Sequence, residues 1–331
     1  MREASSVDEG RSKAGLRSRG RWLRLLGTLV SSALFVWLLV RQDWAVTWRH
    51  LTSIPLWLVL VVFLLYFSGM VLNTWRWSTL LRTQGIRVPF VEMLKIMLSG
   101  AFASNFLPST IGGDSVRVIS LLRFHATLTL SMASVVMDRL LNVLAMFTML
   151  PFSLTVFPVQ FGLGVFPKGL LHLRLLSLIL PWLGLTAAEG WWEKQRARLW
   201  KWFDRVRDIF HAWLNYPGIL LLLFFISWIS SFVIFLAIWM LARALGMPVT
   251  LIQVIGVMAI TYLVSLLPIS INGYGVREIT LTTLYLQVGA TLEQASTLAV
   301  ITRFMLLLEA LPGALWLANA IPSIHREGNG Q

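Results

Sequence analysis

Eight charged side chains stand inside otherwise apolar stretches of the sequence, and they are the residues best able to do chemistry. They are Asp114, Arg117, Asp138, Arg139, Arg277, Glu278, Arg303 and Glu309. A charge in apolar surroundings is costly, so it usually lines a pathway or pairs with another charge. Arginine offers a planar fork of donors that suits phosphate. The set therefore indicates binding of an anionic group.

Two of these arginines follow Pro/Gly breaks that resemble each other. Residues 107–117 (LPSTIGGDSVR) align without gaps on residues 267–277 (LPISINGYGVR), with Leu, Pro, Ile, Gly, Val and Arg at the same places. Such self-similarity predicts an internal repeat. Outside the breaks, the matching positions are Arg82 with Arg243, Gly85 with Gly246, and Arg139 with Arg303.

The first break is predicted to open a helix that binds an anion. Asp114 is the expected N-cap, and the amides that follow it, with Arg117 in the first turn, would face a negative group. Tight turns explain the glycines equally well. The predicted substrate-binding residues of both breaks are Asn105, Gly112, Gly113, Asp114, Arg117, Asn272, Gly273, Gly275, Arg277 and Glu278.

The remaining charged residues are predicted to neutralise charge inside the membrane or to couple transport to a driving force. They are Asp138, Arg139, Arg303 and Glu309. Asp138 and Arg139 are sequence neighbours, so on a helix they do not face each other. We expect Arg139 to reach Asp114 instead. We expect Arg303 to reach Glu278, with structural and functional roles equally open for both pairs. Glu309 is a candidate proton-coupling carboxylate or a partner that neutralises an arginine.

The composition indicates that the elements which position these residues are membrane helices. The 331 residues are 57% hydrophobic and 13% charged, with a net charge of +13 and no cysteine. A soluble protein has about a quarter of its residues charged, so a soluble enzyme is excluded. The lack of cysteine excludes a disulfide scaffold, a thiol nucleophile and thiolate metal sites. Neither a cofactor nor a metal is expected, because the five histidines are scattered.

The apolar blocks predict an all-α polytopic membrane protein. Two shorter apolar segments, residues 91–107 and 251–267, end at the Pro/Gly breaks and resume afterwards, as re-entrant hairpins do. Residues 189–216 have apolar and basic faces, which favours an interfacial amphipathic helix over a solvated linker helix. The expected spans cover residues 22–40, 54–72, 126–150, 169–188, 218–241 and 294–320.

Each half is thus predicted to hold three spans and one re-entrant broken hairpin, so that the second copy is inverted, as in transporters. Without a crossing at residues 169–188 the inversion fails. Lysine and arginine gather on one side of the spans, which predicts cytoplasmic termini and explains the basic charge without nucleic acid. The predicted divisions are a basic tail at 1–21, a membrane domain at 22–320 and a tail at 321–331, with half one at about 22–160, half two at about 169–320 and the interfacial helix at about 190–215.

Residues 105–117, the Asp138–Arg139 pair and residues 267–278 resemble a known family. This is the flippase-like integral membrane family related to the membrane region of lysylphosphatidylglycerol synthase. The resemblance covers residues 54–320 and implies a protein of the bacterial or archaeal cytoplasmic membrane that moves lipids or lipid-linked precursors. It does not carry over the synthase activity, which belongs to a separate soluble aminoacyltransferase domain. The family usually has Glu-Arg at the Asp138–Arg139 position, a change that keeps the charge.

The leading hypothesis is a translocase that moves an anionic phospholipid or a polyprenyl-phosphate-linked lipid between leaflets by alternating access. The alternative is a non-transporting partner that holds a lipid- or polysaccharide-modifying enzyme at the membrane, and an intramembrane transferase ranks third. No enzyme activity and no catalytic residue are expected. The chain lacks His-Glu-x-x-His, a phosphate-binding Gly-x-x-x-x-Gly-Lys-Ser/Thr loop and Gly-x-Ser-x-Gly.

Overall fold

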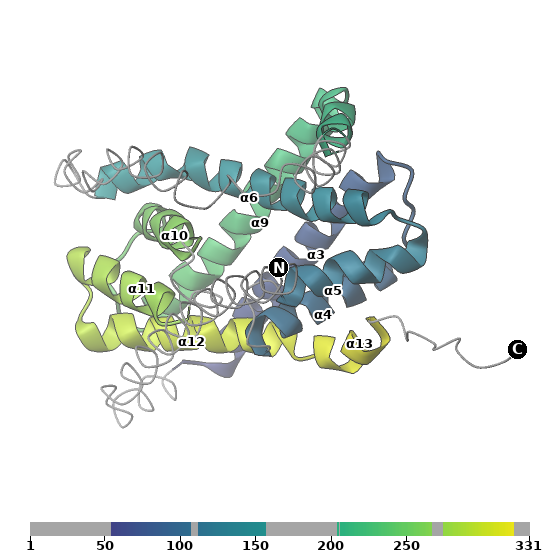
Figure 1. Cartoon of the computed structure of the whole chain (residues 1–331). Helices are drawn as coiled ribbons and strands as arrows, with labels where there is room; N and C mark the ends of the chain where they lie inside the picture. The colour runs from purple at the N-terminus through teal and green to yellow at the C-terminus, as the bar shows by residue number, and fades with distance from the viewer. Residues whose placement is uncertain (1–53, 107–111, 157–203, 205, 267–273, 321–331) are drawn as a thin grey trace, which may run out of the picture.

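The computed structural model of the chain describes residues 54–106, 112–156, 204, 206–266 and 274–320. Within these ranges the regular elements are helices, without a strand. Figure 1 shows α3 and α9 packed side by side through the middle, between α4 and α5 on one side and α10 and α11 on the other. The helices are α3 (Leu56–Arg82), α4 (Phe90–Phe106), α5 (Gly112–Leu121), η1 (Leu122–Phe124), α6 (Leu128–Val156), α9 (Pro217–Ala244), α10 (Leu251–Ser265), α11 (Val276–Gln287), α12 (Leu292–Ala310) and α13 (Gly313–Ala320).

Three of the described helices are long and apolar enough to cross a membrane, namely α3, α9 and residues 128–154 of α6. Large apolar side chains project outward from all three, where only lipid would be a suitable solvent. Examples are Leu60, Leu64, Leu140, Leu144, Phe147, Leu221 and Phe225. The chain is therefore a multi-pass helical membrane protein, as its composition predicts.

The helices α3 and α9 end in the same way. Gly85 and Gly246 follow them with φ of +79° and +73°, a conformation that glycine adopts without strain. The amide of Gly85 donates to the carbonyl of Arg82, and that of Gly246 to the carbonyl of Arg243, both at 3.0 Å. These are the positions that the sequence repeat matches, so the two copies share this local structure.

Two glycines let helices of the second half of the chain approach helices of the first half closely. A Cβ atom on Gly256 of α10 would lie 2.7 Å from the Cα of Ser153 on α6. A Cβ on Gly313 of α13 would lie 2.0 Å from the carbonyl oxygen of Leu98 on α4. The first helix of each broken segment thus packs on a helix far from it in sequence, α10 on α6 and α4 on the short α13.

Two predicted boundaries are wrong. The helix expected at residues 54–72 continues to Arg82. Residues 73–82 contain no glycine or proline that would end it. The span expected at residues 294–320 is two helices, since α12 ends at Ala310 and α13 begins at Gly313. Pro312 lies between them and lacks the amide hydrogen that a continuous helix requires. The spans expected at 22–40 and 169–188 lie outside the described residues.

The described end of the predicted interfacial helix packs on protein. Residues 206–214 are helical, and the indole of Trp213 is buried and donates to the carbonyl of Leu80 at 3.3 Å. Trp213 also meets Phe210 edge-to-face, with ring centroids 5.5 Å apart. The prediction that Trp213 faces the membrane surface is therefore wrong, because α3 extends far enough to cover it. Most of residues 189–216 lies outside the described part of the chain.

Candidate functional site

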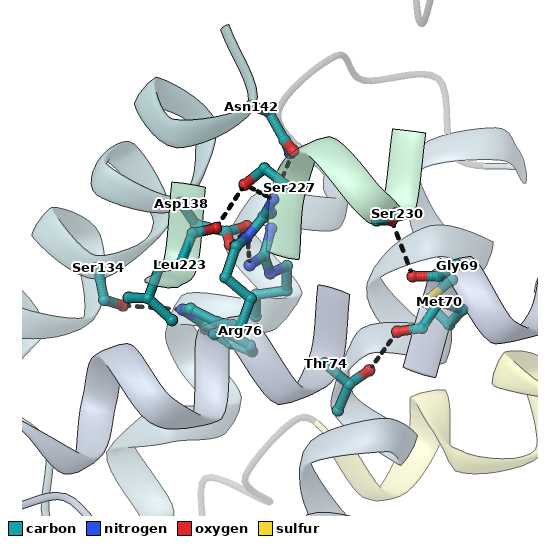
Figure 2. Close-up of polar contacts among 12 residues, drawn as sticks. Gly69, Met70, Thr74, Arg76, Ser134, Asp138, Asn142, Leu223, Ser227 and Ser230 are labelled. Atoms are coloured by element: carbon teal, nitrogen blue, oxygen red, sulfur yellow. Dashed lines mark hydrogen bonds and ion pairs between the residues drawn. The ribbon is translucent and has the colours of Figure 1, made fainter. Parts of the chain in front are cut away.

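A buried ion pair joins the first half of the bundle. Nε and Nη2 of Arg76 on α3 both donate to Oδ1 of Asp138 on α6, at 2.9 and 2.7 Å. Nη1 donates to Asn142 at 2.5 Å and to Ser227 of α9 at 2.6 Å. Figure 2 shows Arg76 reaching all three partners, so one side chain ties α3 to α6 and α9. Its charge is thereby neutralised inside the protein.

A second arginine shares the same carboxylate. Nη2 of Arg117 on α5 donates to Oδ2 of Asp138 at 2.8 Å, and its guanidinium lies 4.1 Å from the ring centre of Trp77. The indole of Trp77 donates in turn to Ser134 at 3.2 Å. Nε of Arg117 is buried and has no hydrogen-bond acceptor among the described residues. Asp138 therefore serves two arginines, and Arg117 retains an unused donor.

Asp114 connects this pair to a more exposed arginine. Its carboxylate lies 2.5 Å from Nη2 of Arg139 and 3.8 Å from Nη1 of Arg117. The expected contact between Arg139 and Asp114 is confirmed. Asp114 is not the N-cap that the sequence predicts, because α5 begins at Gly112 and includes Asp114 in its first turn.

Five side chains consequently form one series of alternating charge. From Arg139 through Asp114, Arg117 and Asp138 to Arg76, their exposed fractions fall from 52% through 23%, 11% and 4% to 1%. Three positive and two negative groups leave one positive charge in excess. Arg139 is half-exposed and not buried as expected, since neighbouring residues of a helix point about 100° apart and only Asp138 of the two faces the interior. The series leads from the surface of the bundle to its interior.

The second half contains a pair that corresponds to Arg139–Asp114. Nε and Nη2 of Arg303 on α12 lie 2.7 and 2.6 Å from Oε1 of Glu278 on α11, which confirms the expected contact. The other oxygen of Glu278 accepts from the amide of Gly275 at 2.8 Å and so caps α11. In both pairs the arginine is on the long helix and the acid on the short helix after the break.

Tyr274 links the two broken segments. Its hydroxyl donates to the carbonyl of Asn105 at the end of α4, at 3.2 Å. Its ring lies under the guanidinium of Arg303, 4.1 Å from ring centre to Cζ. Two residues of the predicted binding segments, or next to them in sequence, therefore meet here. Asn272 and Gly273 lie outside the described residues.

Arg277 has different neighbours from the arginine that it matches in the repeat. It interacts electrostatically with Tyr66 on α3 and Tyr285 on α11, both almost fully buried. Its Nη1 and both tyrosine hydroxyls are buried without a hydrogen-bond partner in the described structure. Glu309 is also buried and close enough to Tyr66 to interact with it. Among the described residues Glu309 forms no ion pair, so no arginine there is neutralised by it.

Of the predicted glycines, Gly113 owes its place to packing. A Cβ there would lie 1.8 Å from the hydroxyl of Ser104 and 2.3 Å from the carbonyl of Gly100. This close approach of α4 and α5 allows Arg117 to extend along Gly100. Gly275 has φ +77° immediately before α11, so it serves the turn. Gly112 is the first residue of α5.

Sequence reasoning missed Arg76, Asn142 and the two buried tyrosines. Hydropathy falls after Leu72, so the sequence alone predicts that Arg76 lies in a cytoplasmic flank. The signal that identifies it is the lack of a helix breaker before Gly85, which places Arg76 two turns beyond Gly69 on the same helix. No comparable sequence signal distinguishes Tyr66 or Tyr285. The described residues contain no cluster of potential metal ligands.

The chain is similar to known membrane proteins. A family model described as lysylphosphatidylglycerol synthase TM region matches residues 24–313. A membrane protein of Archaeoglobus fulgidus assigned to UPF0104 is 29% identical over 158 residues, which is 47% of this chain and 47% of that protein. The chain thus spans about half the length of the curated relative that it matches. No solved structure matches the chain.

Proposed function

Because the chain belongs to the lysylphosphatidylglycerol synthase TM region family, we propose that it is a translocase that moves an anionic lipid, or a lipid-linked precursor, between leaflets. The proposed substrates are an anionic phospholipid and a polyprenyl-phosphate-linked lipid. The proposed membrane is the cytoplasmic membrane of a bacterium or archaeon, with both termini on the cytoplasmic side.

One observation carries this proposal. Arg117 and Arg277 occupy matching positions in the repeat, and each keeps a buried guanidinium nitrogen without an acceptor, Nε in the first and Nη1 in the second. A buried donor that stays without an acceptor costs about 1–3 kcal/mol, and more when it belongs to a charged group. An anionic headgroup that contacts either arginine would supply the missing acceptor. The apolar helices around both sites suit a substrate with lipid tails.

Paired structural features support an inverted repeat and hence alternating access. Gly85 and Gly246 end two long helices with the same hydrogen bonds, and Gly256 and Gly313 mark two similar close crossings. In the centre, the hydroxyl of Ser230 on α9 donates to the carbonyl of Gly69 on α3 at 3.2 Å. Two halves that meet through such contacts are able to rock against each other around a shared site.

The proposal is tested by reconstituting the full chain into liposomes that contain fluorescently labelled phosphatidylglycerol, and by measuring the fraction that a membrane-impermeant quencher bleaches over time. Wild type should accelerate transfer between leaflets over protein-free liposomes. The double variant Arg117→Ala/Arg277→Ala should transfer at the protein-free rate. The control Arg123→Ala/Arg243→Ala changes two exposed arginines and should behave as wild type.

Two outcomes count against the proposal. Transfer by the double variant at the wild-type rate would remove the proposed site. If wild type transfers no anionic lipid faster than protein-free liposomes do, the translocase proposal is wrong. The alternative, a non-transporting partner of a lipid- or polysaccharide-modifying enzyme, is then favoured.

A further inference from the structure

We propose that Arg277, Tyr66 and Tyr285 form a buried binding site for a phosphate-type oxyanion in the second half of the bundle. The inference deepens the proposed function and rests on it in one respect, since it takes the oxyanion to be that of a lipid headgroup. The binding site itself is inferred from buried polar groups that have no hydrogen-bond partner among the described residues.

The first step is the hydrogen-bonding state of the three groups. The side chains of Tyr66 and Tyr285 are 1% and 0% exposed, and neither hydroxyl has a hydrogen-bond partner within the described residues. Buried tyrosine hydroxyls normally find a partner. Nη1 of Arg277 is buried without an acceptor as well. Three such groups that interact with one another electrostatically indicate a shared missing ligand.

The second step is the charge. Glu278 follows Arg277 in the sequence, but one of its oxygens contacts Arg303 at 2.6 Å and the other accepts from the amide of Gly275. Glu278 is thus already paired with Arg303, and Arg277 forms no ion pair with a carboxylate among the described residues. An uncompensated charge inside a membrane protein is strongly unfavourable. The ligand is therefore negative, whereas a water molecule would satisfy hydrogen bonds and leave the charge uncompensated.

The third step is the chemistry of the donors. The guanidinium donates only, and each phenol is able to donate one hydrogen bond. Three buried donors without acceptors suit the oxygens of a phosphate group, with which arginine forms short charge-assisted bonds. Tyrosine holds its hydroxyl on a rigid ring, so few rotamers are lost when the ligand binds.

The fourth step concerns the neighbouring acid. Glu309 interacts electrostatically with Tyr66 and forms no ion pair with Arg277 among the described residues. In its ionised form this carboxyl group would repel an anion bound at Tyr66, whereas in its neutral form it would not. The change Glu309→Gln should therefore strengthen anion binding or leave it unchanged, whereas a variant that merely loosens the fold would weaken it.

The experiment measures binding to the purified full chain in a neutral detergent, as the rise in melting temperature with added inorganic phosphate. A ligand that binds only the folded state raises stability as its concentration exceeds the dissociation constant. Wild type should respond in a saturable way. Tyr66→Phe/Tyr285→Phe should raise the apparent dissociation constant by about tenfold or more, because two hydrogen bonds to a charged acceptor are lost. The control Tyr216→Phe removes an exposed hydroxyl and should match wild type.

Further titrations distinguish the source and the chemistry of the oxyanion. Micelles doped with phosphatidic acid or phosphatidylglycerol should compete with inorganic phosphate if a headgroup is the ligand, whereas phosphatidylcholine micelles should compete more weakly. Acetate that stabilises as well as phosphate would overturn the assignment to phosphate. A wild type that no anion stabilises, or a double variant that phosphate stabilises as it does wild type, would overturn the site and leave water as the occupant.

The binding result and the transfer result are separable. A chain that binds phosphate through these residues but moves no lipid keeps the site and loses the proposed function. The double tyrosine variant could fail to bind phosphate and still transfer phosphatidylglycerol at the wild-type rate. Phosphate binding at this site would then be unrelated to lipid transfer, and the assignment of the oxyanion to a lipid headgroup would be wrong.

Discussion

Arg76 and Asp138 are 62 positions apart in the sequence, yet two nitrogens of the arginine donate to one oxygen of the carboxylate, at 2.9 and 2.7 Å. The contact joins α3 to α6 where both helices are apolar enough to lie in a membrane. Because Arg117 uses the second oxygen of the same carboxylate, Asp138 is the acid on which two helices depend. Several measurable consequences arise from such contacts.

The first prediction concerns Asp138 itself. Asp138→Asn leaves Arg76 and Arg117 without their acid and should lower the free energy of unfolding by about 3–5 kcal/mol, the usual cost of breaking a buried ion pair. Arg76→Met should cost less, because Asp138 then keeps Arg117. Thermal unfolding in detergent measures both changes. Arg82→Met, an exposed change on the same helix, is the control. Equal stability of Asp138→Asn and wild type would contradict the network.

The second prediction concerns the helix crossings. Gly313→Ala and Gly256→Ala should each destabilise the fold by about 1–3 kcal/mol, because the added methyl group meets backbone atoms of the facing helix. Gly218→Ala is the matched control, since nothing lies within 4 Å of a Cβ at that position. It should be neutral or slightly stabilising, because alanine favours a helix. Thermal unfolding of the three variants checks the order, and a tolerant Gly313 would contradict the close packing of α13 on α4.

The third prediction uses Asp114 and rests on the proposed function. Asp114 competes with a substrate anion for Arg117 and Arg139. Asp114→Asn should therefore let transfer of labelled phosphatidylglycerol reach half its maximal rate at a lower mole fraction of that lipid. Glu92→Gln, which removes a carboxylate paired with Lys95, is the control. A higher half-saturating fraction in Asp114→Asn would show that Asp114 positions the arginines instead of competing for substrate.

The fourth prediction concerns Trp213. Trp213→Ala should lower the free energy of unfolding by about 3–5 kcal/mol, as expected for a large side chain in a core. Leu214→Ala should change it little, because Leu214 is exposed. Thermal unfolding separates burial from membrane contact. If Trp213→Ala weakens binding to anionic vesicles while stability is kept, the side chain belongs to the membrane surface after all.

The fold was predictable where the sequence carries local signals. Pro/Gly breaks predict the separation of α4 from α5 and of α10 from α11, and the positive φ of Gly85 and Gly246 agrees with their matched places in the repeat. The end of α3 was not predictable from hydropathy. Arg76 is polar, but its partners are contributed by α6 and α9, and only the folded chain brings these together.

The candidate site was predictable to a similar extent. Spacing and charge suffice to pair Arg139 with Asp114 and Arg303 with Glu278, because oppositely charged residues in apolar sequence have few other partners. They do not reveal that Asp138 serves two arginines, or that Tyr66 and Tyr285 lie beside Arg277. Those relationships depend on which faces of distant helices pack together.

The ion pairs that the two halves share indicate which feature of each pair evolution has kept. Arg139–Asp114 and Arg303–Glu278 each join an arginine on a long helix to an acid on the short helix after the break. The arginine follows the acid by 25 residues in both pairs, although Glu278 lies four residues, or about one helical turn, beyond the position that matches Asp114 in the gap-free alignment of the breaks. The acid and its arginine therefore shift together by one turn relative to the break. Distant homologues are accordingly expected to keep the spacing between acid and arginine and to differ in which turn of the short helix carries the acid.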